Sequence, residues 1–162
     1  MSQQKNIPTD IFSIYTDRLA EGKEEVFSFA ADSTFLEVEE EELSYTGDVQ
    51  IDGKAYLAGH ELIIHIDSEA QAVIPCAICN APVVVPIAIK KLCLAIPAEE
   101  FTSGIFSFRG PLRESIILET PRYVECGGNC PQRALMARYL KQEKDTGKDE
   151  GETYHPFADL KL

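Results

Sequence analysis

The stretch AQAVIPCAICNAPVVVPIAI, residues 70–89, decides the fold because two alternating apolar segments flank a short turn that contains cysteines. Small or apolar residues occupy every second position on both sides of this turn. Period-two alternation is typical of β-strands with one buried face. The stretch therefore predicts an antiparallel hairpin with Cys76 and Cys79 at its tip.

The same alternation extends outward from the hairpin. It predicts further strands over residues 26–30, 48–57, 62–66 and 92–96. Glycine and short polar residues interrupt strands, so we expect a turn or bulge at Gly53 and the end of a strand at Asp67 and Ser68. Cys93 lies in the apolar segment Leu92 to Ile96, which predicts a small core residue without a functional role.

Two segments have helical rather than strand-like spacing. Leu112 and Ile116 predict one or two helical turns before Pro121. Pro131 is a favourable first residue for a helix over residues 132–144. We therefore predict an α+β fold, made mainly of antiparallel β-sheet or a partly open barrel, with a C-terminal helix.

The length of 162 residues favours one domain with a single core. We expect this domain to span residues 1–142 and to include the cysteine pairs and the helix. Residues 143–153 are charged and contain glycine, which predicts a flexible linker. Residues 154–162 regain apolar side chains and predict a tail that docks on the domain. No apolar run approaches the ~20 residues of a membrane span, and the expected location is the cytoplasm.

Four of the five cysteines form two close pairs, Cys76 with Cys79 and Cys126 with Cys130. Two such pairs can supply the four ligands of a structural zinc site. A cytosolic location favours metal over disulfides, because cytosolic thiols are kept reduced. The sequence thus predicts a structural zinc site at these four residues, although the glycine-containing spacer of the second pair is longer than that of the usual motif.

The acidic residues are concentrated in the first half of the chain. Residues 1–75 contain 16 acidic and 4 basic residues, whereas residues 76–162 contain 11 of each. An acidic surface repels nucleic-acid phosphates, so DNA is not an expected ligand. We expect either a basic ribosomal protein at the acidic half or pre-ribosomal RNA at a surface of the second half that includes Lys90, Lys91, Arg109, Arg113, Arg122, Arg133, Arg138, Lys141 and Lys144.

Several segments in succession resemble the YceD family. They are residues 10–22, the strand ladder, the Cys76-to-Cys79 hairpin, residues 114–121 before and at a proline, and the ending at 155–160. This resemblance covers most of the chain. It implies a bacterial ribosome-biogenesis factor that supports accumulation of the large-subunit 23S ribosomal RNA, with no catalytic activity and no small-molecule substrate. Many members carry a longer cysteine array, whereas this chain has no cysteine after Cys130.

Other functional classes have weaker support in the sequence. Cys76 and Cys79 could form a redox dithiol, but that motif normally begins a helix, and a valine-rich segment follows here. No phosphate-binding loop, dinucleotide fingerprint or zinc-protease motif is present, and we expect no enzyme. A zinc-stabilised protein-interaction module unrelated to ribosomes remains the alternative.

Overall fold

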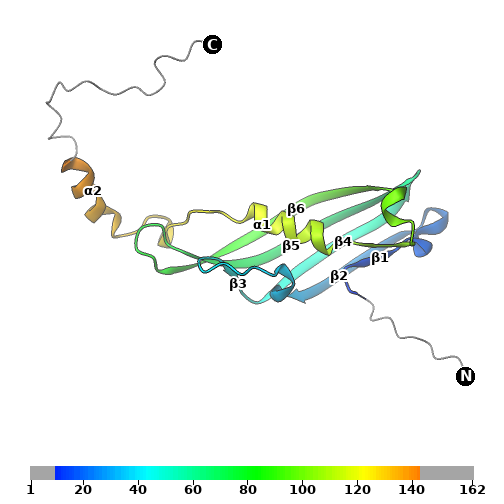
Figure 1. The fold of residues 1–162 in the computed structure, drawn as a ribbon, viewed down its shortest axis with the longest axis horizontal. Helices are drawn as coiled ribbons and strands as arrows, with labels where there is room; N and C mark the ends of the chain where they lie inside the picture. The colour runs from blue at the N-terminus through cyan, green and yellow to red at the C-terminus, as the bar shows by residue number, and fades with distance from the viewer. Residues whose placement is uncertain (1–9, 143–162) are drawn as a thin grey trace, which may run out of the picture.

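The computed structural model describes residues 10–142 (Figure 1). The predicted linker at 143–153 and the predicted tail at 154–162 lie outside the described residues. In chain order the elements are β1 (Ser13–Tyr15), η1 (Thr16–Gly22), β2 (Glu24–Asp32), η2 (Ser33–Leu36), β3 (Ser44–Tyr45), β4 (Asp48–Ala58), β5 (Glu61–Pro75), β6 (Pro82–Pro97), η3 (Ala98–Phe101), β7 (Ile105–Ser107), α1 (Arg109–Glu119), η4 (Cys126–Gly128) and α2 (Arg133–Gln142).

The main sheet is antiparallel and open. Strands β2, β4, β5 and β6 lie side by side in that order, and the short β3 pairs with β5 beyond the end of β4. Strands β1 and β7 form a separate two-stranded ribbon. The α+β prediction is confirmed, in its open-sheet form, and so is the C-terminal helix.

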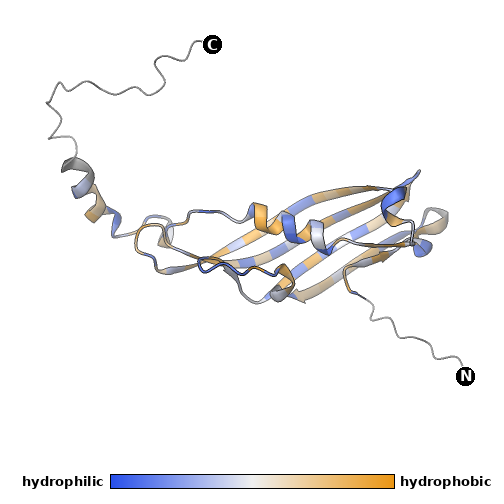
Figure 2. Ribbon diagram, viewed as in Figure 1, coloured by the Kyte–Doolittle hydropathy of each residue, from blue (hydrophilic) through white to orange (hydrophobic). Residues whose placement is uncertain are grey.

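The two faces of the main sheet differ because the strands alternate in hydropathy (Figure 2). The inner face, which α1 and the short helices cover, contains buried residues such as Ile51, Ile64 and Ile87. Side chains on the outer face are exposed on β2 and β6 and partly or fully exposed on β4 and β5. Helix α1 contributes Leu112 and Ile116 to the inner core. No element within residues 10–142 therefore covers the outer face of the sheet.

Strand β5 does not end at Asp67 and Ser68, so that prediction was wrong. Ser68 is buried in phase with Ile66 and Ala70, and its hydroxyl donates to the Gln50 carbonyl oxygen at 2.9 Å. The interruption is a β-bulge instead. Between the pairs Ile66–Leu92 and Ser68–Ile89, one residue of β5 faces two residues of β6. The β5 strand therefore runs without a break to the hairpin tip.

This bulge also places Cys93 on the outer face, where it is exposed. Lys91 adopts a left-handed conformation with φ of 59°, and its amide donates to an Asp67 carboxylate oxygen at 2.6 Å. An extra residue in a strand reverses which side chains face the core. Leu94 and Ile96 consequently lie on the inner face, and the prediction of Cys93 as a core residue was wrong.

Gly53 lies within continuous β4 and not at a turn or bulge. It pairs directly with Phe27 on β2 and Ile66 on β5. A Cβ atom here would lie 2.5 Å from the His65 carbonyl oxygen and 2.5 Å from Cζ of Phe27. The phenylalanine ring thus covers the site where a side chain would stand, which is a known use of glycine in sheets.

We expect Gly53→Ala to lower the free energy of unfolding by about 1–3 kcal/mol, because the added methyl group forces the ring and the strand apart. Urea denaturation measures the change. The matched control is Gly110→Ala in α1, where a Cβ would meet no atom within 4 Å. Alanine favours helices over glycine, so this control should be neutral or slightly stabilising. Equal stability of Gly53→Ala and the wild type would contradict the crowding.

An aromatic cluster fills the core where β2, the β1 segment and the start of α1 meet. The ring of Phe108 is fully buried and stacks on Phe27 with centroids 5.2 Å apart. Phe12 contacts both Phe108 and Phe35, at centroid distances of 5.8 Å and 4.8 Å. Phe108 also donates its amide to the Phe12 carbonyl oxygen at 3.0 Å. The cluster fixes the position from which α1 crosses the sheet.

Strand β6 is an edge strand. Over its sixteen residues it pairs only with β5 within the described part of the chain. Prolines stand at positions 82, 86 and 97 of this strand, and the bulge lies between them.

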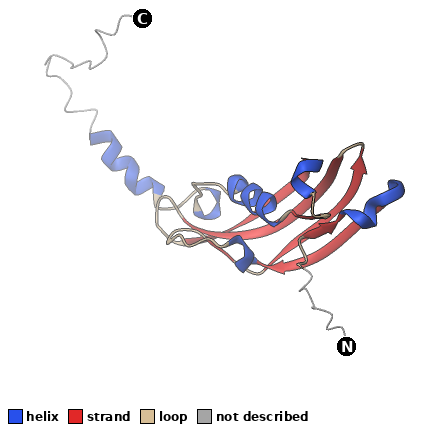
Figure 3. Cartoon of the chain, turned by 45° about the vertical axis from the view of Figure 1, so that its right-hand side comes forward, coloured by secondary structure: helices blue, strands red, loops and turns tan. Residues whose placement is uncertain are grey.

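Helix α2 follows the second cysteine pair and leads away from the sheet (Figures 1 and 3). Its side chains from Arg133 to Tyr139 are all exposed. The predicted helix after Pro131 is confirmed, with its described end at Gln142.

Candidate metal centre

The tip of the β5–β6 hairpin positions the first cysteine pair. The Cys76 amide donates to the Ala81 carbonyl oxygen at 2.8 Å, and the Asn80 amide donates to the Cys76 carbonyl oxygen at 2.9 Å. Asn80 adopts the left-handed conformation with φ of 60°, which asparagine tolerates better than most residues. These hydrogen bonds close a tight turn over residues 76–81, and this turn carries both Cys76 and Cys79.

The segment after α1 brings the second pair to the same place. Val124 forms a parallel bridge with Cys76, and the Ala77 amide donates to the Val124 carbonyl oxygen at 2.9 Å. Gly127 and Gly128 both have positive φ, 63° and 76°. Side chains other than glycine rarely adopt two successive left-handed conformations. The two glycines therefore allow the three-residue spacer to turn Cys130 back towards Cys126.

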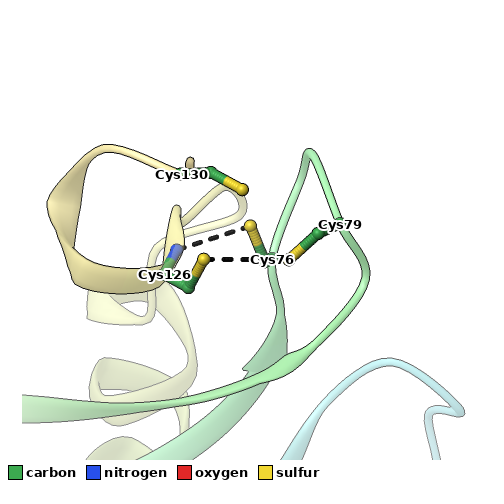
Figure 4. A group of neighbouring side chains, drawn as sticks. All are labelled: Cys76, Cys79, Cys126 and Cys130. Atoms are coloured by element: carbon green, nitrogen blue, oxygen red, sulfur yellow. Dashed lines mark hydrogen bonds between the residues drawn. The ribbon is translucent and has the colours of Figure 1, made fainter. Parts of the chain in front are cut away.

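The four sulfur atoms form one group (Figure 4). Their Sγ atoms all lie within 4.8 Å of one another, and those of Cys79 and Cys126 are 3.7 Å apart. In a tetrahedral zinc site with Zn–S bonds of ~2.3 Å, the sulfur atoms are about 3.8 Å apart. All four cysteines are free thiols. The structure thus brings together Cys76, Cys79, Cys126 and Cys130, the four predicted site residues, in an arrangement compatible with a metal site.

The thiols are held in unequal environments. Cys76 and Cys130 are buried, and the Cys126 amide donates to Sγ of Cys76 at 3.4 Å. Backbone hydrogen bonds from Cys79, Cys126 and Ile78 lower the pKa of Cys76 to about 6. Hydrogen bonds with the Cys130 and Cys79 side chains raise the pKa of Cys126 to about 12, and burial raises the pKa of Cys130. The backbone donors therefore stabilise a thiolate at Cys76 first.

Glu125 supports the second pair, and the sequence reasoning missed it. Its carboxylate accepts hydrogen bonds from the Cys130 amide at 3.1 Å and from Nε of Arg133 at 3.1 Å. It also accepts a hydrogen bond from Nη2 of Arg133. Hydrogen bonds around the ligands of a metal site commonly fix their orientation. Its position directly before Cys126 was the one available signal.

The chemistry of this donor set favours a structural role. Four sulfur ligands complete a tetrahedral shell, whereas catalytic zinc sites keep one position open for water or substrate. Among the described residues, the grouping consists of these four cysteines alone. His65 instead contacts Tyr56, with the phenol oxygen 3.3 Å from Nε2. The centre can cross-link the hairpin to the segment between α1 and α2.

Several of the basic residues considered for RNA contact are engaged within the protein. Lys90 pairs with Glu69, Arg109 with Glu37 and Arg133 with Glu125. Arg113 donates to the Leu36 carbonyl oxygen at 2.5 Å. Lys144 lies outside the described residues. No helix within residues 10–142 combines the length and apolar character needed to cross a membrane.

Comparisons with known proteins do not extend this description. The chain matches no model of a known protein family, no curated protein and no solved structure. The resemblance to the YceD family therefore stays a prediction from the sequence.

Proposed function

We propose that this protein is a non-catalytic ribosome-biogenesis factor that supports accumulation of 23S ribosomal RNA by binding a basic ribosomal protein. One observation carries the proposal: no described element covers the outer face of the main sheet, and most of the charged side chains on this face are acidic. The family resemblance of the sequence supplies the ribosomal context.

Several acidic side chains of the first half lie on that face. Asp48 and Asp52 are exposed on β4, and Asp67 is exposed on the neighbouring β5, directly opposite Asp52. Lys54 and Lys90 are paired with Glu24 and Glu69, and Lys90 also interacts electrostatically with Asp67 and Asp52. These carboxylates outnumber the two lysines, so a cationic partner would be steered to the face.

The metal centre fits this proposal as a structural element. We infer that it holds zinc, because four thiolates are the ligands of structural zinc sites. The centre secures the segment after α1 to the hairpin. It supplies no open position for chemistry, which agrees with a binding protein.

The second candidate is a zinc-stabilised interaction module without a ribosomal role, and the cysteine cluster itself favours it. The two candidates make different predictions in cells. Depletion of the protein should lower mature 23S ribosomal RNA selectively, with 16S ribosomal RNA unchanged, if the ribosomal proposal is correct. Quantification of both RNAs measures this, and no change in either would favour the second candidate.

Charge reversal on the outer face should prevent binding of the basic partner. We expect Asp48→Lys combined with Asp52→Lys to abolish recovery of a basic large-subunit protein in low-salt pull-downs. Charge pairs at interfaces are sensitive to salt, so the wild-type complex should also weaken as salt rises. Mass spectrometry of the recovered proteins measures both effects.

The matched control reverses two charges elsewhere. Glu99→Lys with Glu100→Lys changes the net charge equally, at exposed positions of η3, and should leave recovery unchanged. Equal loss in both variants would show a net-charge effect only. Recovery of naked RNA that does not decrease at high salt would contradict the proposal that the partner is a basic ribosomal protein.

A further inference from the structure

Helix α2 has no surface to pack against in the described part of the chain. Its described side chains are exposed, including Leu135 at 53%, Met136 at 47% and Tyr139 at 75%. An isolated helix of this length is marginal in water, and most helical stability in proteins comes from packing of an apolar face. A packing surface for α2 is therefore missing.

The helix is basic as well as amphipathic. Leu135, Met136 and Tyr139 lie on one face at helical spacing, and Arg138 lies beside them in sequence. The segment Arg133–Gln142 contains three basic and no acidic residues. In a protein with a net charge of −12, this composition favours an apolar surface with an acidic rim.

A groove beside the metal centre has these properties. It has a volume of about 630 Å³ and lies between the hairpin tip, the end of α1 and the segment before β3. Leu118 and Tyr123 line it and are 77% and 82% exposed. Glu40 and Glu42 also line it, against one arginine, Arg122. Its apolar and acidic character complements that of α2.

Glu125 holds the start of α2, and no described residue of α2 lines the groove of the same molecule. Both carboxylate oxygens of Glu125 bind the Arg133 guanidinium, and the Arg133 amide donates to the Cys130 carbonyl oxygen at 3.0 Å. From this point α2 extends outward from the sheet (Figure 3). A ten-residue helix is about 15 Å long, which is long enough to lie along a groove offered by a neighbouring molecule.

We propose that α2 of one molecule lies in this groove of a second copy, and that the exchange is reciprocal. The result is a two-fold symmetric dimer, in which the same pair of surfaces is used twice. The apolar face of α2 covers Leu118 and Tyr123, and Arg138 approaches the glutamates of the rim. This contact is separate from the acidic outer face and does not depend on the ribosomal proposal.

Light scattering and sedimentation equilibrium of the full chain test the proposal. The wild type should be a dimer. Leu135→Gln with Tyr139→Gln keeps good helix formers in α2 and should weaken dimerisation by about tenfold or more, because central apolar anchors dominate such contacts. Leu118→Gln with Tyr123→Gln should weaken it similarly from the other side.

Mixing the two variants distinguishes exchange from simple helix pairing. The helix variant retains an intact groove, and the groove variant retains an intact helix. Their mixture should form a heterodimer under conditions where each variant alone is monomeric. Pairing of α2 with α2 predicts no such rescue, and failure of the mixture to associate overturns the exchange.

The matched control is Val26→Gln, which removes an apolar side chain that is 73% exposed on the outer face. This variant should remain dimeric. Circular dichroism confirms that each variant is folded. A wild type that stays monomeric up to about 100 μM, where a micromolar contact would be saturated, overturns the proposal.

Discussion

Replacing Cys126 by serine should remove zinc from the protein. A serine hydroxyl is a poor substitute for a thiolate, and only three sulfur ligands would remain. Loss of a supporting hydrogen bond alone lowers metal affinity by about 10–100-fold, so loss of a direct ligand should exceed about a hundredfold. Native mass spectrometry should find one zinc ion in the wild type and none in Cys126→Ser.

The sheet should survive this substitution because its core lies away from the centre. The segment Val124 to Cys130 should instead become sensitive to proteolysis, since the hairpin would no longer hold it. The control is Cys93→Ser, which alters an exposed cysteine on the outer face and should retain one zinc ion. The zinc proposal would be refuted if freshly purified wild type contained no metal, or if Cys126→Ser still bound zinc.

Phe108→Ala should be the most destabilising single substitution in the aromatic cluster. The fully buried ring stacks on Phe27 and contacts Phe12. Truncation of a buried phenylalanine to alanine costs about 3–5 kcal/mol, because transfer free energy is lost and a cavity remains. Urea denaturation should show this loss as a lower midpoint with an unchanged slope.

Two further variants separate cavity formation from general sensitivity. Phe108→Leu keeps most of the apolar volume and should cost less than about 1.5 kcal/mol. Val84→Ala removes exposed carbon atoms on β6 and should change stability by less than about 0.5 kcal/mol. Similar losses for Phe108→Ala and Phe108→Leu would refute the role assigned to the ring.

The strands were predictable from alternation, but their continuity was not. Ile66, Ser68 and Ala70 alternate in phase, yet the polar pair at Asp67 and Ser68 suggested an end. Burial of Ser68 requires a hydrogen-bond partner, and the Gln50 carbonyl oxygen that provides it belongs to another strand. No local pattern contains that information.

Cys93 shows how one inserted residue misleads the assignment of faces. The core prediction for Cys93 rested on its place in the apolar segment Leu92 to Ile96, and a count in steps of two from Ile87 and Ile89 would have given the same result. The bulge at Lys91 shifts the count by one. The apolar alternation of Leu92, Leu94 and Ile96 was the signal that could have shown the shift.

The members of the cysteine cluster were predictable from the sequence, but the contacts that assemble it were not. Cysteine spacing identified the four residues, whereas the glycines of the second pair read as a departure from the usual motif until their left-handed conformations were seen. The Cys76–Val124 bridge and the Glu125 carboxylate depend on how the segment after α1 returns to the hairpin. Long-range placement of this kind follows from packing of the whole domain and leaves no local signature.

Within the described residues β6 has one unpaired edge, and this edge bears on aggregation of the protein at cellular concentrations. A long apolar strand with unpaired backbone groups is a template for stacking into aggregates. Prolines at 82, 86 and 97 lack the amide that another strand would need, and the bulge distorts the ladder between them. These features make uncontrolled polymerisation along this edge unfavourable. The protein can therefore avoid aggregation along this edge, while its other surfaces remain accessible for specific binding.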